Sequence, residues 1–484
     1  MAWPRERNRR WQGLKPRSGL VSCVETSVDF SVTFVNVVPK VMPRRENLTM
    51  HETTKNLLCR LCLAPMAFVA LALTGCASAP LAVPANPTPP ATEGVVRVVP
   101  PMDDAATLQA GVVRWAAGFS ETARAAGIDE ATLHAAFDDL HYLPRVVELD
   151  RAQPEFTRTV WDYLDSAVSP QRIALGQDQW QAFRREAEAA AARYGVPPAI
   201  LVAIWGIESN YGRNYGNTST IDALATLGFE GRREVWARGQ LLDALRILQS
   251  GDIDREHMIG SWAGAMGQTQ FLPSNFLAYA VDADGDGRRD IWGSLADVIA
   301  STANFLSRSG WQSDQSWGAE VQLPPGFDLN RADPAVRQSA ERWAAEGLRT
   351  ADGGPLPALP DLSDSSILLP AGARGPAFLV GPNFRVILRY NNSTSYALAV
   401  GLLAQKLAGG PGVQGQWPRD LRALSRSEIL DMQTTLNQRG FASGTPDGMM
   451  GPATQGAVRR YQISVGLAAD GFPTPALLDR LLRP

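Results

Sequence analysis

The residue best placed for acid chemistry in this 484-residue sequence is Glu208, which ends a long apolar stretch. Pro197 and Pro198 begin the stretch at positions where a first helical turn tolerates missing amide donors. Residues 200–207 are apolar nearly all round, so we expect a buried helix. Burial removes water from a carboxylate, and the negative end of the helix dipole faces it, so both effects favour the protonated form. A general acid needs such a neutral carboxyl near pH 7.

Two structural interpretations of Glu208 compete with the catalytic one. A glutamate at a helix end is often solvated, and a buried carboxylate is often the partner of a cation such as the nearby Arg213. Perturbed acids are also common in structural ion pairs, so the helix alone does not decide between these interpretations. The other motifs of the sequence have to decide.

The charge balance and the cysteines exclude several classes of site. Residues 1–75 hold 11 basic and 5 acidic residues, which leaves 35 of the 46 basic and 44 of the 49 acidic residues, a formal charge of −9, from Cys76 onward. A protein this acidic is a poor partner for nucleic acid. The cysteines are Cys23, Cys59, Cys62 and Cys76, so no disulfide framework or thiol metal site is expected after position 76.

The first 105 residues divide into three segments, none of which has the pattern of an enzyme domain. Residues 1–49 are basic and lack sustained periodicity, so we interpret them as a mis-assigned upstream segment, with translation beginning at Met50 or Met42. Residues 50–75 are typical of a lipoprotein signal peptide, because their apolar run is too short to span a bilayer. Residues 76–105, rich in Pro and Ala, are expected to form a semi-rigid linker.

The signal segment ends in Leu73-Thr74-Gly75-Cys76, which resembles the bacterial lipobox. The resemblance implies that signal peptidase cuts before Cys76 and that lipid is attached to its sulfur. Because Ala77 and not Asp follows, the resemblance also implies transfer to the outer membrane. Several acyl chains anchor a protein stably, at about 0.8 kcal/mol for each buried methylene. An ordinary signal peptide with an incidental cysteine is the alternative.

Residues 106–408 are expected to form one mainly α domain with a small β insertion. Helical periodicity is present in residues 108–126, 128–140, 182–194, 233–250, 296–309 and 396–408. Short strands are predicted at 321–323, 378–380 and 384–388, between turns rich in Gly and Pro. A linker at 409–420 separates this domain from a compact module of residues 421–484.

Three motifs, in the same order, resemble the membrane-bound lytic murein transglycosylase B family. They are residues 195–212, which include Glu208-Ser-Asn-Tyr-Gly, residues 260–274, GSWAGAMGQTQFLPS, and residues 389–396, RYNNSTSY. The resemblance covers residues 106–408 and implies a lysozyme-like fold. It also implies that Glu208 is the single catalytic acid and base, and that the nucleophile is the C6 hydroxyl of the sugar itself.

The product of that reaction is a 1,6-anhydro sugar, formed without net hydrolysis. One carboxylate then suffices, whereas a glycoside hydrolase usually needs two carboxylates about 5 to 9.5 Å apart. No second acid stands in a comparably apolar stretch of the sequence, but Asp222 and Glu230 stay open as candidates.

Several polar residues in these motifs are candidates for holding the sugar. Small residues in the Gly-rich segment 260–274 allow the backbone to approach a ligand closely. Tyr and Asn side chains stack on sugars and bind their acetamido and hydroxyl groups. The expected substrate-binding residues are Tyr163, Ser261, Gln268, Gln270, Tyr390, Asn391 and Tyr396, of which the family resemblance places Ser261 and Gln270 in the cleft. Tight helix packing of the Gly-rich segment and a core role for the tyrosines are the structural alternatives.

Residues 282–297 contain a loop with the spacing of a calcium site. Aspartates occupy positions 1, 3, 5 and 9 of an EF-hand-like loop, and Gly287 at position 6 permits the sharp turn. Position 12 is Gly293 where the standard loop has a bidentate Glu, and Asp297 is the expected substitute. The transglycosylase family has a similar loop, so a structural Ca²⁺ is expected on Asp282, Asp284, Asp286, Asp290 and Asp297. The alternative is a surface turn that binds nothing, and the chemistry itself requires no cofactor.

Residues 421–484 resemble the three-helix peptidoglycan-binding domain found on many wall enzymes. The turn at residues 446–454, PDGMMGPAT, and its weaker echo at 470–474 support the resemblance. Leu430, Leu436, Val458 and Leu467 are expected to form the small core of this module. A helical module for another partner is the alternative.

Together these features predict a lipoprotein on the periplasmic face of the outer membrane. Its expected partners are peptidoglycan glycan strands, in which it would cleave the β-1,4 bond between N-acetylmuramic acid and N-acetylglucosamine to leave 1,6-anhydromuramic acid ends. A hydrolytic muramidase and a non-catalytic peptidoglycan-binding lipoprotein are the two alternatives.

Overall fold

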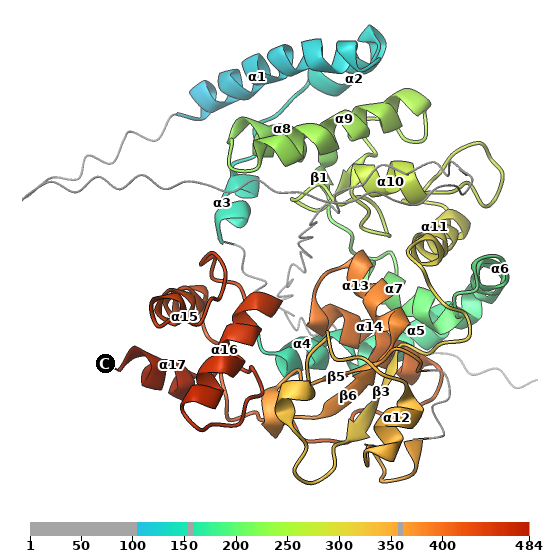
Figure 1. The fold of residues 1–484 in the computed structure, drawn as a ribbon. Helices are drawn as coiled ribbons and strands as arrows, with labels where there is room; N and C mark the ends of the chain where they lie inside the picture. The colour runs from blue at the N-terminus through green and yellow to red at the C-terminus, as the bar shows by residue number, and fades with distance from the viewer. Residues whose placement is uncertain (1–103, 153–157, 357–361, 484) are drawn as a thin grey trace, which may run out of the picture. The chain divides into compact units, whose positions relative to one another are not determined.

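The computed structural model describes residues 104–152, 158–356 and 362–483 (Figure 1). The predicted upstream segment, the signal peptide, the lipidation site Cys76 and nearly all of the following linker lie outside the described residues. The described residues cover the predicted catalytic domain and the C-terminal module.

The prediction of a mainly α fold is confirmed. The helices before residue 408 are α1 Ala105–Ala125, α2 Glu130–Phe137, α3 Pro144–Ala152, α4 Val160–Ala167, α5 Pro170–Ala182, α6 Arg184–Tyr194, α7 Pro198–Ser209, α8 Thr220–Phe229, α9 Glu234–Ser250, α10 Pro273–Tyr279, α11 Leu295–Arg308, α12 Ala340–Ala345, α13 Pro382–Tyr390 and α14 Thr394–Leu407. The six periodic segments found in the sequence correspond to α1, α2, α6, α9, α11 and α14, and the apolar stretch before Glu208 is α7.

Helix α7 is the central element of this domain. Every residue from Ile200 to Ser209 is buried, and the helix packs against α5, α6, α11 and α14. No single helix among the described residues is long and apolar enough to cross a membrane, although α6 and α7, bent by 116°, meet that test as a pair. Because α7 has no exposed face, the polar groups near its end must be satisfied by protein or ligand.

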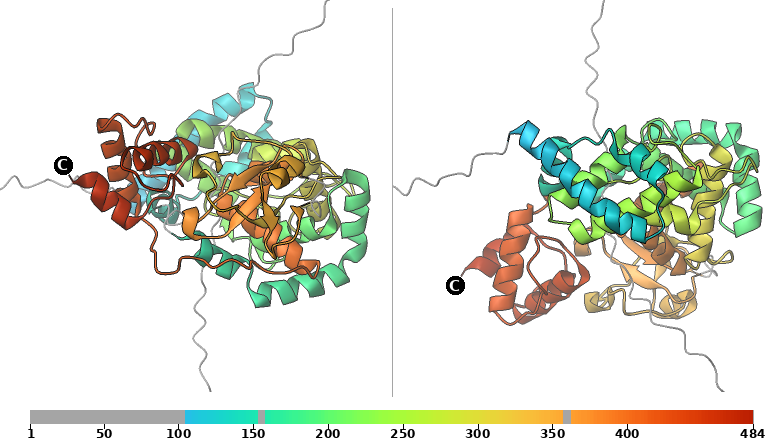
Figure 2. Two further views of the ribbon diagram at one scale, coloured as in Figure 1. Left: turned by 60° about the horizontal axis from the view of Figure 1, so that its bottom comes forward. Right: turned by 90° about the horizontal axis from the view of Figure 1, so that it is seen from above.

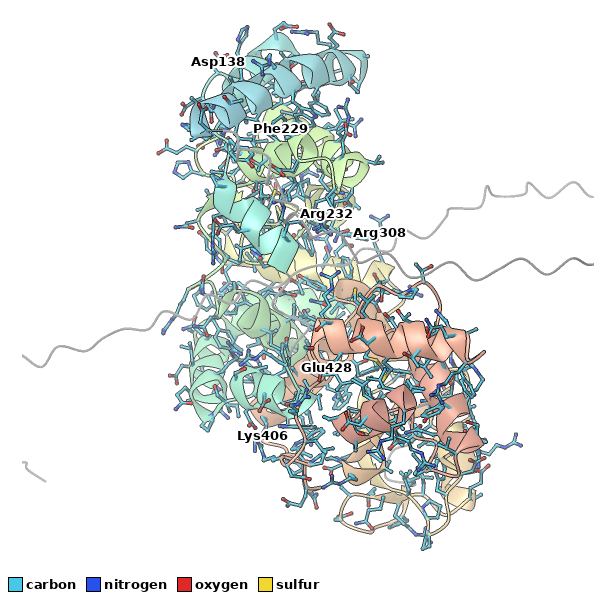
Figure 3. All side chains as sticks on the ribbon, turned by 90° about the vertical axis from the view of Figure 1, so that its left-hand side faces the viewer. Asp138, Phe229, Arg232, Arg308, Lys406 and Glu428 are labelled. Carbon is cyan, nitrogen blue, oxygen red and sulfur yellow. The ribbon has the colours of Figure 1, made fainter. Side chains whose placement is uncertain are left out.

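A second group of helices consists of α1, α2, α8 and α9 (Figures 1 and 2). Helix α8 packs along α9, α1 packs on α8, and α2 packs on α9. Phe229, at the end of α8, lies beneath α1 (Figure 3) and meets the ring of Tyr142 edge-on, with the centroids 5.9 Å apart. Helix α3 joins this group through its contacts with α8.

The β insertion is a four-stranded antiparallel sheet in the order β4-β3-β6-β5. Its strands are β3 Gly318–Gln322, β4 Arg349–Thr350, β5 Ser366–Leu368 and β6 Ala377–Val380. A small core of its own forms around Trp343 of α12, which is fully buried. Two further strands, β1 Thr218–Ser219 and β2 Ile259–Gly260, pair with each other at the start of the Gly-rich segment.

The prediction of a strand at residues 384–388 is wrong, because these residues belong to α13. Phe384, Ile387 and Tyr390 are buried at intervals of three, which is the period of one helix face. A five-residue apolar run does not distinguish a strand from a helix by periodicity, and Pro382 in the first turn favours the helix. Tyr390 and Asn391 therefore end a helix and do not follow a strand.

Residues 421–483 form the expected module of three helices, α15 Arg426–Gln438, α16 Pro452–Ser464 and α17 Pro475–Leu482 (Figure 2). Leu436 and Val458 are in its core as predicted. Leu430 and Leu467 are each 41% exposed, so their assignment to the core is wrong. Leu430 lies off the face of α15 on which Ile429, Met432 and Leu436 recur at helical spacing, and Leu467 lies in the loop after α16. The core is completed by Ile429, Met432, Tyr461, Leu477, Leu478 and Leu481.

Helix α14 approaches Trp317 so closely that only glycine fits at position 401. A Cβ at Gly401 would lie 2.4 Å from the indole ring. We expect Gly401→Ala to reduce the free energy of unfolding by about 1–3 kcal/mol, because overpacking forces the ring or the helix to move. Gly239 in α9 is exposed, and a Cβ at this position would meet nothing within 4 Å. Gly239→Ala should therefore raise the free energy of unfolding by about 0.5–1 kcal/mol. Denaturant unfolding measures the free energy of unfolding of both variants. Equal effects of the two substitutions would contradict the close packing of α14 on Trp317.

Candidate active site

Glu208 is buried at the end of α7 and has one hydrogen-bond partner. The residue is only 4% exposed. Tyr396, in the first turn of α14, donates its hydroxyl to Oε1 over 2.6 Å. Oε2 is buried as well and receives no hydrogen bond from any described residue. The fold therefore fixes one carboxyl oxygen and leaves the other without a protein partner.

This environment decides the protonation state of the acid. Burial raises the pKa of Glu208 to about 8, and the hydrogen bond from Tyr396 partly opposes the rise. At pH 7 the carboxyl is therefore mostly neutral. Both structural interpretations of Glu208 fail, because the side chain is buried and Arg213 is exposed and makes no ion pair with it among the described residues.

The chain reverses direction directly after the acid. Asn210, Tyr211 and Gly212 have φ values of 48°, 60° and 76°, a left-handed conformation that costs energy in the first two residues. Packing offsets this cost, because the Tyr211 ring meets Trp205 edge-on at 5.4 Å and its hydroxyl donates to the Arg172 carbonyl over 2.9 Å. The reversal places the carboxyl at the wall of a cavity, with no further helical turn covering it.

The cavity has a volume of about 390 Å³, which is within the range of small-ligand sites. Its wall is built from the start of α3, the turn after α7, the start of α8 and the Gly-rich segment. The lining residues are Leu143, Arg145, Val146, Leu149, Glu208, Asn214, Tyr215, Gly216, Asn217, Thr218, Ser219, Asp222, Gly260, Ser261, Trp262 and Gln270.

Two of the predicted substrate-binding residues, Ser261 and Gln270, share this cavity with Glu208. The Ser261 hydroxyl accepts from the backbone of Ala265 over 3.2 Å, which leaves its own proton for a further acceptor. The Gln270 amide nitrogen donates to the Tyr215 carbonyl over 3.0 Å, and the residue has a left-handed φ of 51°. Hydrogen bonds to the backbone therefore fix both polar groups in residues that line the cavity.

The other five predicted residues do not line the cavity. Gln268 accepts from the indole nitrogen of Trp205 over 2.8 Å and donates to the Trp292 carbonyl over 2.7 Å. Tyr390 is buried, and its hydroxyl donates to a backbone carbonyl in the Gly-rich segment over 2.8 Å. Asn391 is buried just after α13. In this structure Gln268 and Tyr390 brace the loop that carries Gln270.

Three tyrosines, Tyr163, Tyr390 and Tyr396, lie near enough to Glu208 for its charge to act on them. Tyr390 and Tyr396 are stacked with their ring centroids 6.5 Å apart. Burial and then the charge of Glu208 raise the pKa of Tyr163, Tyr390 and Tyr396, so their hydroxyls stay protonated donors. The structure thus places Tyr396 against the acid, where the sequence had predicted a sugar contact, and Tyr163 close enough to sense its charge.

The two candidates for a second acid are engaged elsewhere. Asp222 lines the same cavity, but its Oδ1 pairs with Arg255 over 2.6 Å and accepts from the backbone of His141 over 3.2 Å. Glu230 pairs with Arg151 over 2.9 Å and does not line the cavity. Among the described residues, Glu208 is the only carboxyl in the cavity wall without an ion pair.

The sequence did not identify the wall formed by α3, which contributes Leu143, Arg145, Val146 and Leu149. Residues 144–152 were not predicted as a helix, and their approach to Glu208 depends on the packing of α3 against α8. Trp262 was also missed, although it stands in the Gly-rich motif. A tryptophan among small residues beside the predicted cleft was the available signal.

The predicted metal loop gathers three of its five expected ligands. One carboxylate oxygen from each of Asp282, Asp284 and Asp286 lies within 4.8 Å of the others. The carboxylate of Asp282 also accepts from the backbone of Gly285 and Gly287, over 2.6 and 2.9 Å. These contacts close the turn in the way that the Asp and Gly spacing predicted.

Asp290 and Asp297 are not part of this cluster. Asp290 accepts from the backbone of Trp292 and Gly293, each over 2.8 Å. Asp297 is fully buried, accepts from the backbone of Ala283 and Asp290 over 2.7 Å, and has its pKa raised by burial. Asp297 thus joins the two ends of the loop, a structural task that its position in the sequence did not reveal.

Known proteins resemble this chain in sequence and in fold. Residues 111–405 match the model of the transglycosylase SLT domain family, and residues 425–481 match that of a peptidoglycan binding domain. Membrane-bound lytic murein transglycosylase B of Escherichia coli is 36% identical over 253 residues, which are 51% of this chain and 66% of that relative.

Solved structures agree with the sequence comparison. SltB3 from Pseudomonas aeruginosa, solved in complex with NAG-NAM-pentapeptide, is 52% identical with a TM-score of 0.74, over 76% of this chain and 99% of that chain. Escherichia coli lytic transglycosylase Slt35, solved in complex with calcium, is 31% identical with a TM-score of 0.52, over 61% of this chain and 92% of that chain. The chain therefore belongs to the transglycosylase SLT domain family and is a peptidoglycan lytic transglycosylase with a lysozyme-like fold and a C-terminal peptidoglycan-binding domain.

Proposed function

We propose that Glu208 alone supplies both proton transfers of an intramolecular transglycosylation, which cleaves the β-1,4 bond between N-acetylmuramic acid and N-acetylglucosamine. The single observation that carries this proposal is the neutral, buried carboxyl whose Oε2 has no protein partner. Because Tyr396 donates to Oε1, the proton of the neutral acid belongs on Oε2, where a substrate oxygen would receive it.

The reaction proceeds in two proton transfers. Oε2 first protonates the glycosidic oxygen, and N-acetylglucosamine leaves with a free 4-hydroxyl as positive charge develops at C1 of the muramic acid. The C6 oxygen of the same sugar then attacks C1, and its proton returns to the Glu208 carboxylate. The acid is regenerated, no water is consumed, and the product carries a 1,6-anhydro ring.

Tyr396 serves this cycle as a positioning residue. Its hydroxyl holds one carboxyl oxygen while the other faces the substrate, and the same hydrogen bond stabilises the carboxylate between the two transfers. The stacked ring of Tyr390 and the start of α14 fix the direction of that hydroxyl. We assign Ser261 and Gln270, which line the wall, and the predicted contacts Asn391 and Tyr163 to sugar binding.

The flanking segments are proposed to bring the enzyme to its substrate. The lipobox-like sequence at Cys76 supports an anchor in the outer membrane, with the enzyme on the periplasmic face. The C-terminal module raises the effective concentration of the catalytic domain on peptidoglycan. Once the module is bound, the encounter of the catalytic domain with the same polymer is intramolecular. The relative from Escherichia coli is described as membrane-bound, which supports this location.

Asp282, Asp284 and Asp286 are proposed to hold a structural Ca²⁺. Hard carboxylate oxygens on alternate residues suit calcium, and the three that converge here fit it. The calcium complex of Slt35 supports the assignment. The ion would have no part in the proton transfers, because its ligands do not line the cavity.

Substitution of the acid tests the reaction directly. We expect Glu208→Gln to lower turnover of purified murein by at least about 100-fold, because an amide cannot protonate the leaving oxygen. Mass spectrometry of the wild-type muropeptides should show products lighter by one water than hydrolytic products. The exposed Glu234→Gln is the matched control and should digest normally. Hydrated products from the wild-type enzyme would instead support a hydrolytic muramidase with Asp222 as its second carboxylate.

The raised pKa of Glu208 sets the alkaline limit of activity. Only the protonated acid starts the reaction, so kcat/KM should be constant below the pKa and fall as the pH rises through about 8. Tyr396→Phe removes the hydrogen bond that lowers this pKa, so the falling limb should move to higher pH while the maximum rate drops. Rates measured from pH 5 to pH 10 test both. A limb that shifts to lower pH in Tyr396→Phe would contradict the assigned role.

Calcium should stabilise the folded domain. A ligand present at 100 times its Kd contributes about 2.7 kcal/mol, so added Ca²⁺ should raise the Tm by several degrees and a chelator should reverse the rise. Asp284→Asn should abolish the calcium effect, because it removes one of the three converging carboxylates. Asp314→Asn, an exposed aspartate outside the loop, is the control. Melting of the wild-type protein that is insensitive to calcium and chelator would refute the site.

A further inference from the structure

Two residues that line the cavity each have a buried polar atom that lacks a hydrogen-bond partner among the described residues. One is Oε2 of Glu208, which the proposed reaction explains. The other is the indole Nε1 of Trp262, in a residue that is 4% exposed. A buried donor without an acceptor costs about 1–3 kcal/mol, so a donor of this kind in a residue that lines a cavity calls for an acceptor from a ligand.

The fold holds Trp262 rigidly beside the acid. The residue follows β2 in a tight loop, where the Ser261 amide donates to the Ala265 carbonyl over 2.8 Å. Its ring belongs to a small apolar cluster with Val146 of α3 and Ala223 of α8. An indole fixed in this way cannot turn its N–H toward another acceptor without repacking the cluster.

The surroundings of this donor indicate what it binds. An indole N–H only donates, so the ligand must present an oxygen acceptor. Leu143, Val146 and Leu149 share both the cavity and the apolar cluster with Trp262, so the acceptor is joined to an apolar group. A hydroxyl would bring a proton that needs its own acceptor against this apolar wall, and a carboxylate would lose more hydration than one neutral donor returns.

We propose that Trp262 recognises the acetamido group of an N-acetylated sugar, with its indole N–H donating to the acetamido carbonyl and the acetamido methyl packing against Leu143, Val146 and Leu149. An acetamido group combines an uncharged carbonyl acceptor with a methyl in the arrangement that this part of the wall offers. Trp262 is thereby a specificity-determining residue for the reaction proposed above, on which the inference rests.

The test compares substrates with and without the acetyl group. The wild-type enzyme digests murein that is fully acetylated, murein de-N-acetylated only at glucosamine, and murein de-N-acetylated only at muramic acid. We expect kcat/KM to fall by at least about 3- to 10-fold for one of the two modified substrates, mainly through KM, and re-acetylation of that substrate to restore it. Equal rates on all three substrates would overturn the inference.

Trp262→Phe keeps an aromatic ring and removes the N–H. This variant should lose about 3- to 10-fold in kcat/KM on acetylated murein and change little on the substrate that the wild-type enzyme disfavours. Trp311→Phe is the matched control, since Trp311 also has a buried indole nitrogen without a partner but does not line the cavity. Equal losses on both substrates would show that the indole only packs, and would overturn the inference.

A spectroscopic measurement covers the case in which Trp262→Phe does not fold. Glu208→Gln protein with ¹⁵N-labelled indoles is mixed with an N-acetylated peptidoglycan tetrasaccharide and, separately, with its de-N-acetylated form. The Trp262 indole proton should move downfield only with the acetylated ligand, and an unmoved signal would overturn the inference. Anhydro products from the wild-type enzyme establish the reaction itself independently of either result.

Discussion

The structure depends on the burial of one carboxyl group in an apolar environment. Helix α7 has no exposed face, and Glu208 at its end has lost nearly all of its contact with water. A carboxylate in such a place is costly, so the group is neutral at pH 7 and can donate a proton. One hydrogen bond, from Tyr396, keeps that cost small enough for the anion to form during a reaction. A stronger partner such as an arginine would stabilise the anion, and the carboxyl would then hold no proton to donate at pH 7.

The packing around α7 maintains this balance. Tyr396 comes from α14, and α14 reaches its position only because Gly401 allows the ring of Trp317 to approach. The left-handed turn after Glu208 is held in a similar way, because a Cβ at Gly212 would lie 2.3 Å from the amide oxygen of Gln268. Gln268 in turn bonds to Trp205 of α7. Residues that never touch the cavity therefore determine where the acid points.

The sequence predicted the parts of the site that depend on local pattern. The apolar stretch before Glu208 and the Asp and Gly spacing of the metal loop are local signals, and both gave the expected backbone. Contacts set by tertiary packing were not predictable in this way. The hydrogen bond from Tyr396 to the acid and the contacts by which Asp297 joins the two ends of the metal loop were not predicted. At 384–388 the apolar run suited a strand or a helix equally, and tertiary context selected the helix.

Unsatisfied polar atoms illustrate why the cavity had to be seen before its residues could be assigned. Buried side-chain atoms without a partner among the described residues also occur in Thr220, Trp311 and Ser316, which do not line the cavity. An orphan atom alone is therefore no sign of a ligand. Glu208 and Trp262 both line a cavity of suitable size, the first with the carboxyl proposed as the proton donor and the second with an indole N–H. A sugar with an acetamido group and a glycosidic oxygen could satisfy both atoms at once, so substrate binding would complete the hydrogen bonding that folding leaves unfinished.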